Sequence, residues 1–252
     1  MNKTKIEWVK NPDGSQGYTV NPVKGKCPMG CEYCYMWGKR GIGTRFHFDQ
    51  TVQYDPRVWS GIGNLRKPSR IFVGSTIELF HDSLCPQYLK WIFEVPVKFP
   101  QHTFIFLTKC PQNLTKFSPF PENCWVGVTA TNGRMVDDAG YYLERIEAKV
   151  KFLSLEPLLE PIHLYFGKPG ISWLIIGAQT NPLRLPAISW VREIVEAVDK
   201  AGIKVFLKNN LRPLLIPEDC PKLNYLTEDI FWASEKAQLR QEMPEINVPI
   251  RM

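Results

Sequence analysis

Three cysteines fall within eight residues near the N-terminus, in the run Cys27-Pro28-Met29-Gly30-Cys31-Glu32-Tyr33-Cys34. Such a C-x3-C-x2-C loop cannot be a disulfide framework, because three is an odd number and the turns between the thiols are too short for relaxed pairing. Pro28 and Gly30 favour tight turns, since proline presets φ and glycine tolerates φ > 0. The loop is therefore predicted to wrap a metal centre.

The spacing, with the aromatic Tyr33 just before the third cysteine, resembles the signature of radical S-adenosylmethionine (SAM) enzymes. A [4Fe–4S] cluster that only carries electrons takes four thiolates. The resemblance implies that Cys27, Cys31 and Cys34 hold three irons, and that the fourth iron binds the amino and carboxylate groups of SAM. Reductive cleavage of SAM to a 5′-deoxyadenosyl radical would follow. Such an enzyme needs an external electron donor of the flavodoxin or ferredoxin type.

Zinc is the alternative metal for this loop. Cys31-x2-Cys34-x12-His47, with Cys27 added, would give a Cys3His set of roughly finger-like spacing. The chain would then be a zinc-stabilised, non-catalytic nucleic-acid-binding protein. C-x3-C-x2-C packing is unusual for zinc knuckles, which favours the cluster. Three unligated cysteines fit less well, because free cysteines are usually buried singly.

The other cysteines, Cys85, Cys110, Cys124 and Cys220, stand at no ligand spacing. We expect them to be free thiols in a reducing compartment. A second iron–sulfur cluster, held by some of them, is the alternative. No stretch approaches the about 18 apolar residues of a membrane helix, and the N-terminus has no apolar signal-peptide region. We expect a soluble cytoplasmic protein without a membrane partner. The net charge of +6 permits a phosphate-bearing partner, and no feature indicates an oligomeric state.

Short apolar runs recur along the chain and are typical of strands buried on both faces. They cover residues 18–23, 70–74, 103–108, 125–129, 150–154, 173–177 and 204–208. Two segments between them have helical periodicity, one from Val136 to Val150 and one from Ile188 to Val198, closed by Gly202. Alternating strands and helices predict an α/β fold with a parallel sheet. About six to seven strands indicate a partial or irregular (β/α) barrel of the radical SAM type.

The barrel is expected to occupy residues 1–211. Residues 212–252 hold five prolines and one helix-like stretch, from Ser234 to Glu242. This composition indicates a C-terminal extension that packs on the barrel rather than a second domain.

Polar residues follow nearly every predicted strand. Loops at the C-terminal strand ends build the active site of β/α barrels, so these groups should converge on the face that carries the cysteine loop. Similarity to radical SAM enzymes implies that Gly74, Ser75 and Thr76 meet the SAM amino group and that the main chain at Tyr33 meets adenine. The full predicted cofactor-binding set is Tyr33, Gly74, Ser75, Thr76, Glu78, Thr108, Lys109, Thr129, Ser154 and Glu156.

Structural roles remain open for several of these residues. A Ser or Thr at a strand end often caps the next helix. Glu156, which precedes Pro157, could instead pair with Lys109 or Lys208.

A closer resemblance covers residues 5 to about 210. The chain is similar to phage-associated three-Cys-motif proteins in an ordered series of strings. These include Lys5-Ile6-Glu7-Trp8, Phe72-Val73-Gly74-Ser75, Glu78-Leu79-Phe80-His81, Leu107-Thr108-Lys109, Leu155-Glu156-Pro157 and Phe206-Leu207-Lys208. The cysteine spacing is more compact than in many members. Gln179 stands where an acidic residue is common, so a role for that acid is not carried over.

The leading hypothesis for the substrate is a nucleic acid or nucleotide, which the enzyme would modify or repair. The cysteine string also resembles that of spore photoproduct lyase, a radical SAM DNA-repair enzyme, and the segment 39–45 is basic. A small metabolite or a peptide of a partner protein is the alternative substrate.

Overall fold

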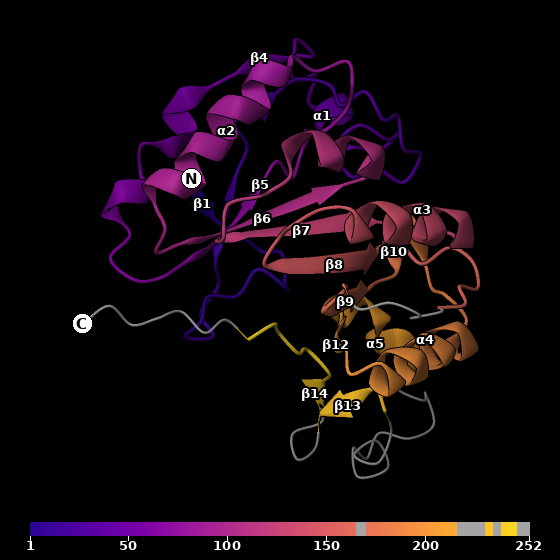
Figure 1. Ribbon diagram of the computed structural model, residues 1–252. Coiled ribbons are helices and arrows are strands. Elements are labelled where there is room, and N and C mark those ends of the chain that lie inside the picture. The colour runs from indigo at the N-terminus through magenta and orange to yellow at the C-terminus, as the bar shows by residue number, and fades with distance from the viewer. Residues whose placement is uncertain (165–169, 216–229, 234–237, 246–252) are drawn as a thin grey trace.

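The structure is a computed structural model that describes residues 1–164, 170–215, 230–233 and 238–245 of the 252-residue chain (Figure 1). Its helices are α1 (Ile42–Arg45), α2 (Pro86–Lys98), α3 (Gly133–Glu144), α4 (Ile188–Lys200) and α5 (Arg212–Leu215). Its main strands are β1 (Asn2–Lys3), β2 (Tyr18–Val20), β5 (Arg70–Val73), β6 (Thr103–Thr108), β7 (Cys124–Thr129), β8 (Val150–Leu155), β9 (Trp173–Ile176) and β12 (Lys204–Leu207). Three two-stranded antiparallel sheets pair β3 (Val23–Lys24) with β4 (Gln53–Tyr54), β10 (Gln179–Thr180) with β11 (Leu183–Arg184), and β13 (Trp232–Ala233) with β14 (Gln238–Leu239).

One eight-stranded sheet organises the fold, in the order β1-β2-β5-β6-β7-β8-β9-β12. β1 is antiparallel to β2, and every other neighbouring pair is parallel. All seven predicted strands are present in this sheet, so the α/β class and the parallel sheet are confirmed. The spatial order follows the sequence without a reversal, and the parallel pairing from β2 to β12 places the carboxyl ends of these seven strands at one edge.

Alternate residues of the strands face the two sides of the sheet. On the outer side, Phe106 and Leu155 share one apolar core with the helices. Ile92 of α2, Ala139 of α3 and Val195 of α4 belong to the same core, and Figure 1 shows these helices around the sheet. The crossover helices therefore cover one face, as parallel strands require.

Trp8 lies at the centre of the inner face. The centroid of its indole is 4.9 Å from the ring of Phe72 on β5 and 6.1 Å from the ring of Trp173 on β9. In a flat sheet β5 and β9 would lie about 19 Å apart, because four spacings of about 4.8 Å separate them. One side chain cannot span that distance, so the sheet curves around Trp8.

The two predicted helices are present, with one difference in length. α4 spans the expected residues, and Gly202, at φ +67°, follows its end. α3 ends at Glu144, whereas the periodicity continued to Val150, which instead begins β8. Ile146 still packs in the core between the two elements, because a buried connection also needs apolar residues.

The C-terminal segment packs along β12. Leu207 N–H donates to Arg240 O at 2.7 Å, and Glu242 N–H donates to Val205 O at 2.9 Å. The helix predicted from Ser234 to Glu242 is wrong for the described residues 238–242, since Gln238–Leu239 is β14 and Gln241 bridges to Phe206. An edge strand with unpaired backbone groups accepts an extended segment more readily than a helix. Residues 234–237 lie outside the described residues. In the described part of the chain no helix has the length and apolar character needed to cross a membrane.

Replacing Trp8 with alanine should remove the ring around which the sheet curves. Trp8 is 2% exposed, and truncating a buried aromatic side chain costs about 3–5 kcal/mol. Urea denaturation should show that loss in the free energy of unfolding. Trp91 on α2 is 41% exposed, so Trp91→Ala should cost about 1 kcal/mol or less. Equal losses in both variants would contradict the central position of Trp8.

Candidate functional site

The cysteine loop follows β3, and the turn between β2 and β3 is tied to the loop after β5. Asn21 Oδ1 accepts hydrogen bonds from Ser75 N–H at 2.8 Å and from Ser75 Oγ at 3.2 Å. Within the loop, Cys34 N–H donates to Cys31 O at 3.1 Å, and Gly30 has φ +63°. The left-handed conformation at Gly30 explains the glycine between the first two cysteines.

The three thiols are free, partly buried and open into one cavity of about 600 Å³. Cys27 Sγ accepts from Glu78 N–H at 3.3 Å, and Cys34 Sγ accepts from Trp37 N–H at 3.3 Å. Hydrogen bonds to sulfur stabilise a thiolate and tune an iron–sulfur cluster. Burial raises the pKa of the Cys27 thiol, so a bound cation would be needed to keep that group ionised at neutral pH.

A single-ion site is not assembled in the described residues. No group of three His, Cys, Asp or Glu side chains among them lies close enough to hold a metal ion. The zinc alternative requires Cys27, Cys31, Cys34 and His47 around one tetrahedral centre, with Zn–S distances of about 2.3 Å. His47 is exposed, after α1. In a cube each thiolate binds a different iron, so the thiols need not converge on one point, and the cluster stays a prediction.

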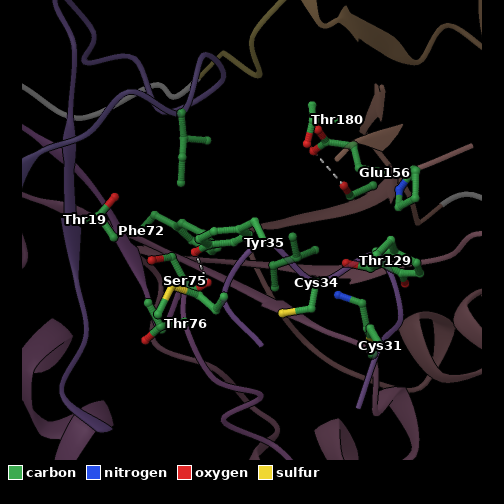
Figure 2. A pocket seen from close by; sticks show the side chains of 18 of the residues that line it. Thr19, Cys31, Cys34, Tyr35, Phe72, Ser75, Thr76, Thr129, Glu156 and Thr180 are labelled. Carbon is green, nitrogen blue, oxygen red and sulfur yellow. Dashed lines mark hydrogen bonds between the residues drawn. The ribbon is translucent and has the colours of Figure 1, made fainter. Parts of the chain in front are cut away.

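The same cavity gathers the predicted strand-end residues (Figure 2). They come from the loops and carboxyl ends after β2, β5, β6, β7 and β8. The predicted residues that line the cavity are Cys27, Cys31, Tyr33, Cys34, Gly74, Ser75, Thr76, Glu78, Lys109, Thr129, Ser154 and Glu156. The structure thus brings together every predicted residue except Thr108.

Thr108 is buried on the outer side of β6, outside the cavity lining. Its hydroxyl donates to Glu78 Oε1 and accepts from Cys110 N–H at 2.8 Å. Glu78 also accepts from Lys109 N–H at 2.8 Å and from Phe80 N–H at 3.1 Å. The hydrogen bonds of the Glu78 carboxylate therefore join the segment after β5 to the end of β6. Glu78 and Thr108 both position the site in this way.

Glu156 is held in a partly buried network. Lys208, after β12, pairs with Glu156 Oε1 at 2.5 Å, as the structural alternative predicted. Trp8 Nε1 donates to Oε2 at 3.1 Å, and Ser154 Oγ donates to the same oxygen at 3.0 Å. Burial opposes the charge of Lys208, but Glu156 outweighs it and raises the Lys208 pKa. Lys208 stays protonated in the cavity wall.

Gly177 makes this network possible. A Cβ at Gly177 would lie 3.0 Å from Glu156 Oε1 and 2.9 Å from Lys208 Cδ. The glycine at the end of β9 is therefore needed for space rather than for an unusual backbone angle.

Two threonine hydroxyls face the cavity and have no partner among the described residues. Thr129 is 1% exposed, and both Thr129 Oγ1 and Thr19 Oγ1 are buried without a hydrogen bond to that part of the chain. Thr129 and Lys109 also line a second cavity of about 240 Å³ that adjoins the first. Buried polar groups are normally hydrogen-bonded to protein or water, so these hydroxyls are available to a ligand in the cavity.

Several lining residues escaped the sequence prediction. Thr19 lies inside β2, Lys3 ends β1, which was not predicted, and Lys5 and Tyr35 lie in loops. Tyr35 Oη donates to Ser75 O at 2.6 Å, as Figure 2 shows. A signal existed for Lys5, which stands in one of the shared sequence strings.

The lining carries more positive than negative groups. In the part of the chain that the structure describes, no carboxylate pairs with the ammonium groups of Lys3, Lys5 or Lys109. Glu78 and Glu156, the lining carboxylates, are already occupied. The cavity is suited to an anionic ligand.

Comparison with curated proteins and with solved structures gave no match. Residues 3–211 match the family described as "Protein of unknown function (DUF5131)". The matched region contains the cysteine loop, the cavity-lining strand ends and nearly all of the eight-stranded sheet. Because it spans most of the chain, the protein belongs to the DUF5131 family.

Proposed function

We propose that this protein is a radical SAM enzyme that holds a [4Fe–4S] cluster through Cys27, Cys31 and Cys34. The observation that supports it most is that three thiols in C-x3-C-x2-C spacing open into the same cavity as the polar ends of parallel strands. When bound, the cluster would supply one electron for cleavage of a C–S bond of SAM to a 5′-deoxyadenosyl radical. Three thiolates leave one iron without a protein ligand.

The sheet would be the partial (β/α) barrel of that superfamily. Two observations support this proposal. The parallel strands follow one another in sequence order, as in barrels and unlike doubly wound sheets. The sheet also curves around Trp8, which contacts strands four places apart.

The turn at Gly74, Ser75 and Thr76 would receive the ammonium group of SAM. Gly74 N–H already donates to Val20 O, and Ser75 N–H donates to Asn21 Oδ1. The carbonyl oxygens of the turn can accept hydrogen bonds from an ammonium group, and Ser75 O also accepts from Tyr35 Oη. At Gly74, with φ +80°, a Cβ would lie 2.5 Å from Leu79 Cδ1, so only glycine fits this turn.

Lys208 and Thr129 would complete the SAM contacts. Glu156 holds the Lys208 ammonium in the cavity wall, where it could pair with the SAM carboxylate. The Thr129 hydroxyl is buried beside the cavity and lacks a partner, so a ribose hydroxyl would satisfy it. Adenine would lie against the main chain at Tyr33.

The substrate would be a nucleic acid or nucleotide. Lys3, Lys5 and Lys109 line the cavity without a carboxylate partner among the described residues, and a phosphate is a fitting counterion. An external flavodoxin or ferredoxin would supply the electron.

Anaerobic reconstitution with iron and sulfide tests the proposal directly. We expect about four irons per chain, and 5′-deoxyadenosine after addition of SAM and dithionite. Cys31→Ala should lose the iron, because two thiolates rarely hold a cube. Cys85→Ala is the matched control, since Cys85 is an exposed free thiol outside the cavity, and it should keep the iron. One tightly held zinc and no 5′-deoxyadenosine would overturn the proposal.

Two threonine replacements separate ligand binding from structure. Thr129→Val removes a hydroxyl without a partner, so the free energy of unfolding should not fall. SAM affinity of the reconstituted protein, measured by equilibrium dialysis, should fall about two- to tenfold, the value of one hydrogen bond. Thr108→Val strips a fully bonded hydroxyl and should cost about 1–3 kcal/mol of stability. A destabilised Thr129→Val with unchanged SAM affinity would argue for a structural role.

A further inference from the structure

An exposed basic and aromatic surface lies directly after the cysteine loop. It is formed by residues 37–48, which include α1, and we call it the basic aromatic segment. Phe46 is 60% exposed and Phe48 is 48% exposed. Lys39, Arg40 and Arg45 are exposed beside them. Large exposed aromatic rings next to cations are unusual on a surface that contacts only water.

The segment is folded against the residues that follow Cys34. Ile42 N–H donates to Tyr35 O, and Gly43 N–H donates to Met36 O, both at 2.8 Å. A Cβ at Gly43 would lie 2.9 Å from the ring of Trp37, so the helix turn packs closely on that indole. The exposed side chains are therefore displayed on a fixed backbone.

Residues 50–51, which follow the basic aromatic segment, also lie beside the start of the cysteine loop. Lys26, which immediately precedes Cys27, donates its N–H to Gln50 O at 3.0 Å. A Cβ at Gly25 would lie 2.5 Å from Thr51 O, so these two segments of the chain are in close contact. The basic aromatic segment is thus anchored next to the cysteine loop at both ends.

Its cations have no carboxylate partners among the residues that the structure describes, because no ion pair there involves Lys39, Arg40 or Arg45. The rings of Phe46 and Phe48 are nearly parallel, at 27°, with centroids 6.4 Å apart. The Arg45 guanidinium lies 4.9 Å from the centroid of the Phe46 ring. One compact surface therefore offers flat apolar rings and unpaired positive charge.

We propose that the basic aromatic segment binds single-stranded nucleic acid and delivers it to the cavity, an inference that rests on the proposed function. Cations that track phosphates, interleaved with aromatic rings on which bases stack, are the usual elements of single-strand binding. A base inside a duplex could not enter a cavity of about 600 Å³ without leaving the stack. An acidic electron donor would be attracted by the same charges but has no use for a pair of exposed phenyl rings.

Fluorescence anisotropy with labelled single-stranded DNA and RNA of mixed sequence, and with the matched duplex, tests this inference. The full chain should bind a single strand more tightly than the duplex. The logarithm of the affinity should fall linearly with the logarithm of salt concentration, by about 0.7 per phosphate contact. Lys39→Ser/Arg40→Ser should reduce that slope by about 1.4.

The aromatic rings are tested separately from the charge. Phe46→Ala/Phe48→Ala should weaken single-strand binding about tenfold or more and leave the salt slope nearly unchanged. Tyr141→Ala is the matched control, because Tyr141 is 53% exposed and also lies beside an arginine, Arg145, but on α3. It should change the affinity less than twofold. If the double alanine variant unfolds, Phe46→Leu/Phe48→Leu keeps apolar volume without an aromatic face and should show the same loss.

The results that would contradict single-strand binding differ from those that would contradict the proposed enzymatic function. No single-strand affinity at low salt, or full affinity in the aromatic variants, would overturn the single-strand surface even if SAM is cleaved. Loss of flavodoxin binding in Lys39→Ser/Arg40→Ser, without any nucleic-acid affinity, would assign the surface to the electron donor instead. Single-strand binding by a protein that neither holds four irons nor cleaves SAM would instead overturn the enzymatic function.

Discussion

The packing of Trp8 against the inner face of the sheet is the contact on which the rest of the structure depends. It brings β5 and β9 within reach of one indole, which requires the curvature of the sheet. The same indole donates its N–H to Glu156 and so enters the wall of the cavity. The cavity depends on this ring in two ways. The curvature of the sheet around the indole creates the space, and the hydrogen bond from the indole N–H orients the Glu156 carboxylate in the cavity wall.

The inner face changes character along the strands. In β7 the inner positions run from Trp125 to Thr129, and in β8 they run from Val150 through Phe152 to Ser154. The aromatic ends pack around Trp8, whereas the polar ends line the cavity. Gly127 permits this arrangement, because a Cβ there would lie 2.3 Å from the ring of Phe152. The aromatic side chains around Trp8 therefore form the base of a cavity whose lining includes the polar strand ends and more lysines than carboxylates.

Much of this arrangement could be predicted from the sequence because apolar runs and strand ends are local signals. The apolar runs predicted the seven strands. The convergence of their polar ends then followed from the rule that the carboxyl ends of parallel strands lie at one edge of the sheet. Thr108 was predicted to line the cavity because it ends a strand. Side chains alternate between the two faces of a sheet, however, and Thr108 lies on the same face as Phe106, which packs against the helices. The Glu156–Lys208 pair was foreseen as an alternative, but its link to Trp8 joins residues 148 positions apart, a contact that no local pattern contains. The predicted helix near the C-terminus failed in its described part because the open edge of β12 favoured an extended segment.

The hydrogen bonds of residues 240–242 along β12 have a consequence for how the chain is made. Until these residues leave the ribosome, β12 presents unpaired backbone groups at the sheet edge, and exposed edges can recruit strands from other chains. Domains begin to fold during synthesis from the N-terminus, so the sheet and its cavity can form while that edge is still open. Residues 240–242 therefore cover the edge of β12 only late in synthesis, and the nascent protein can mispair at that edge until they have emerged.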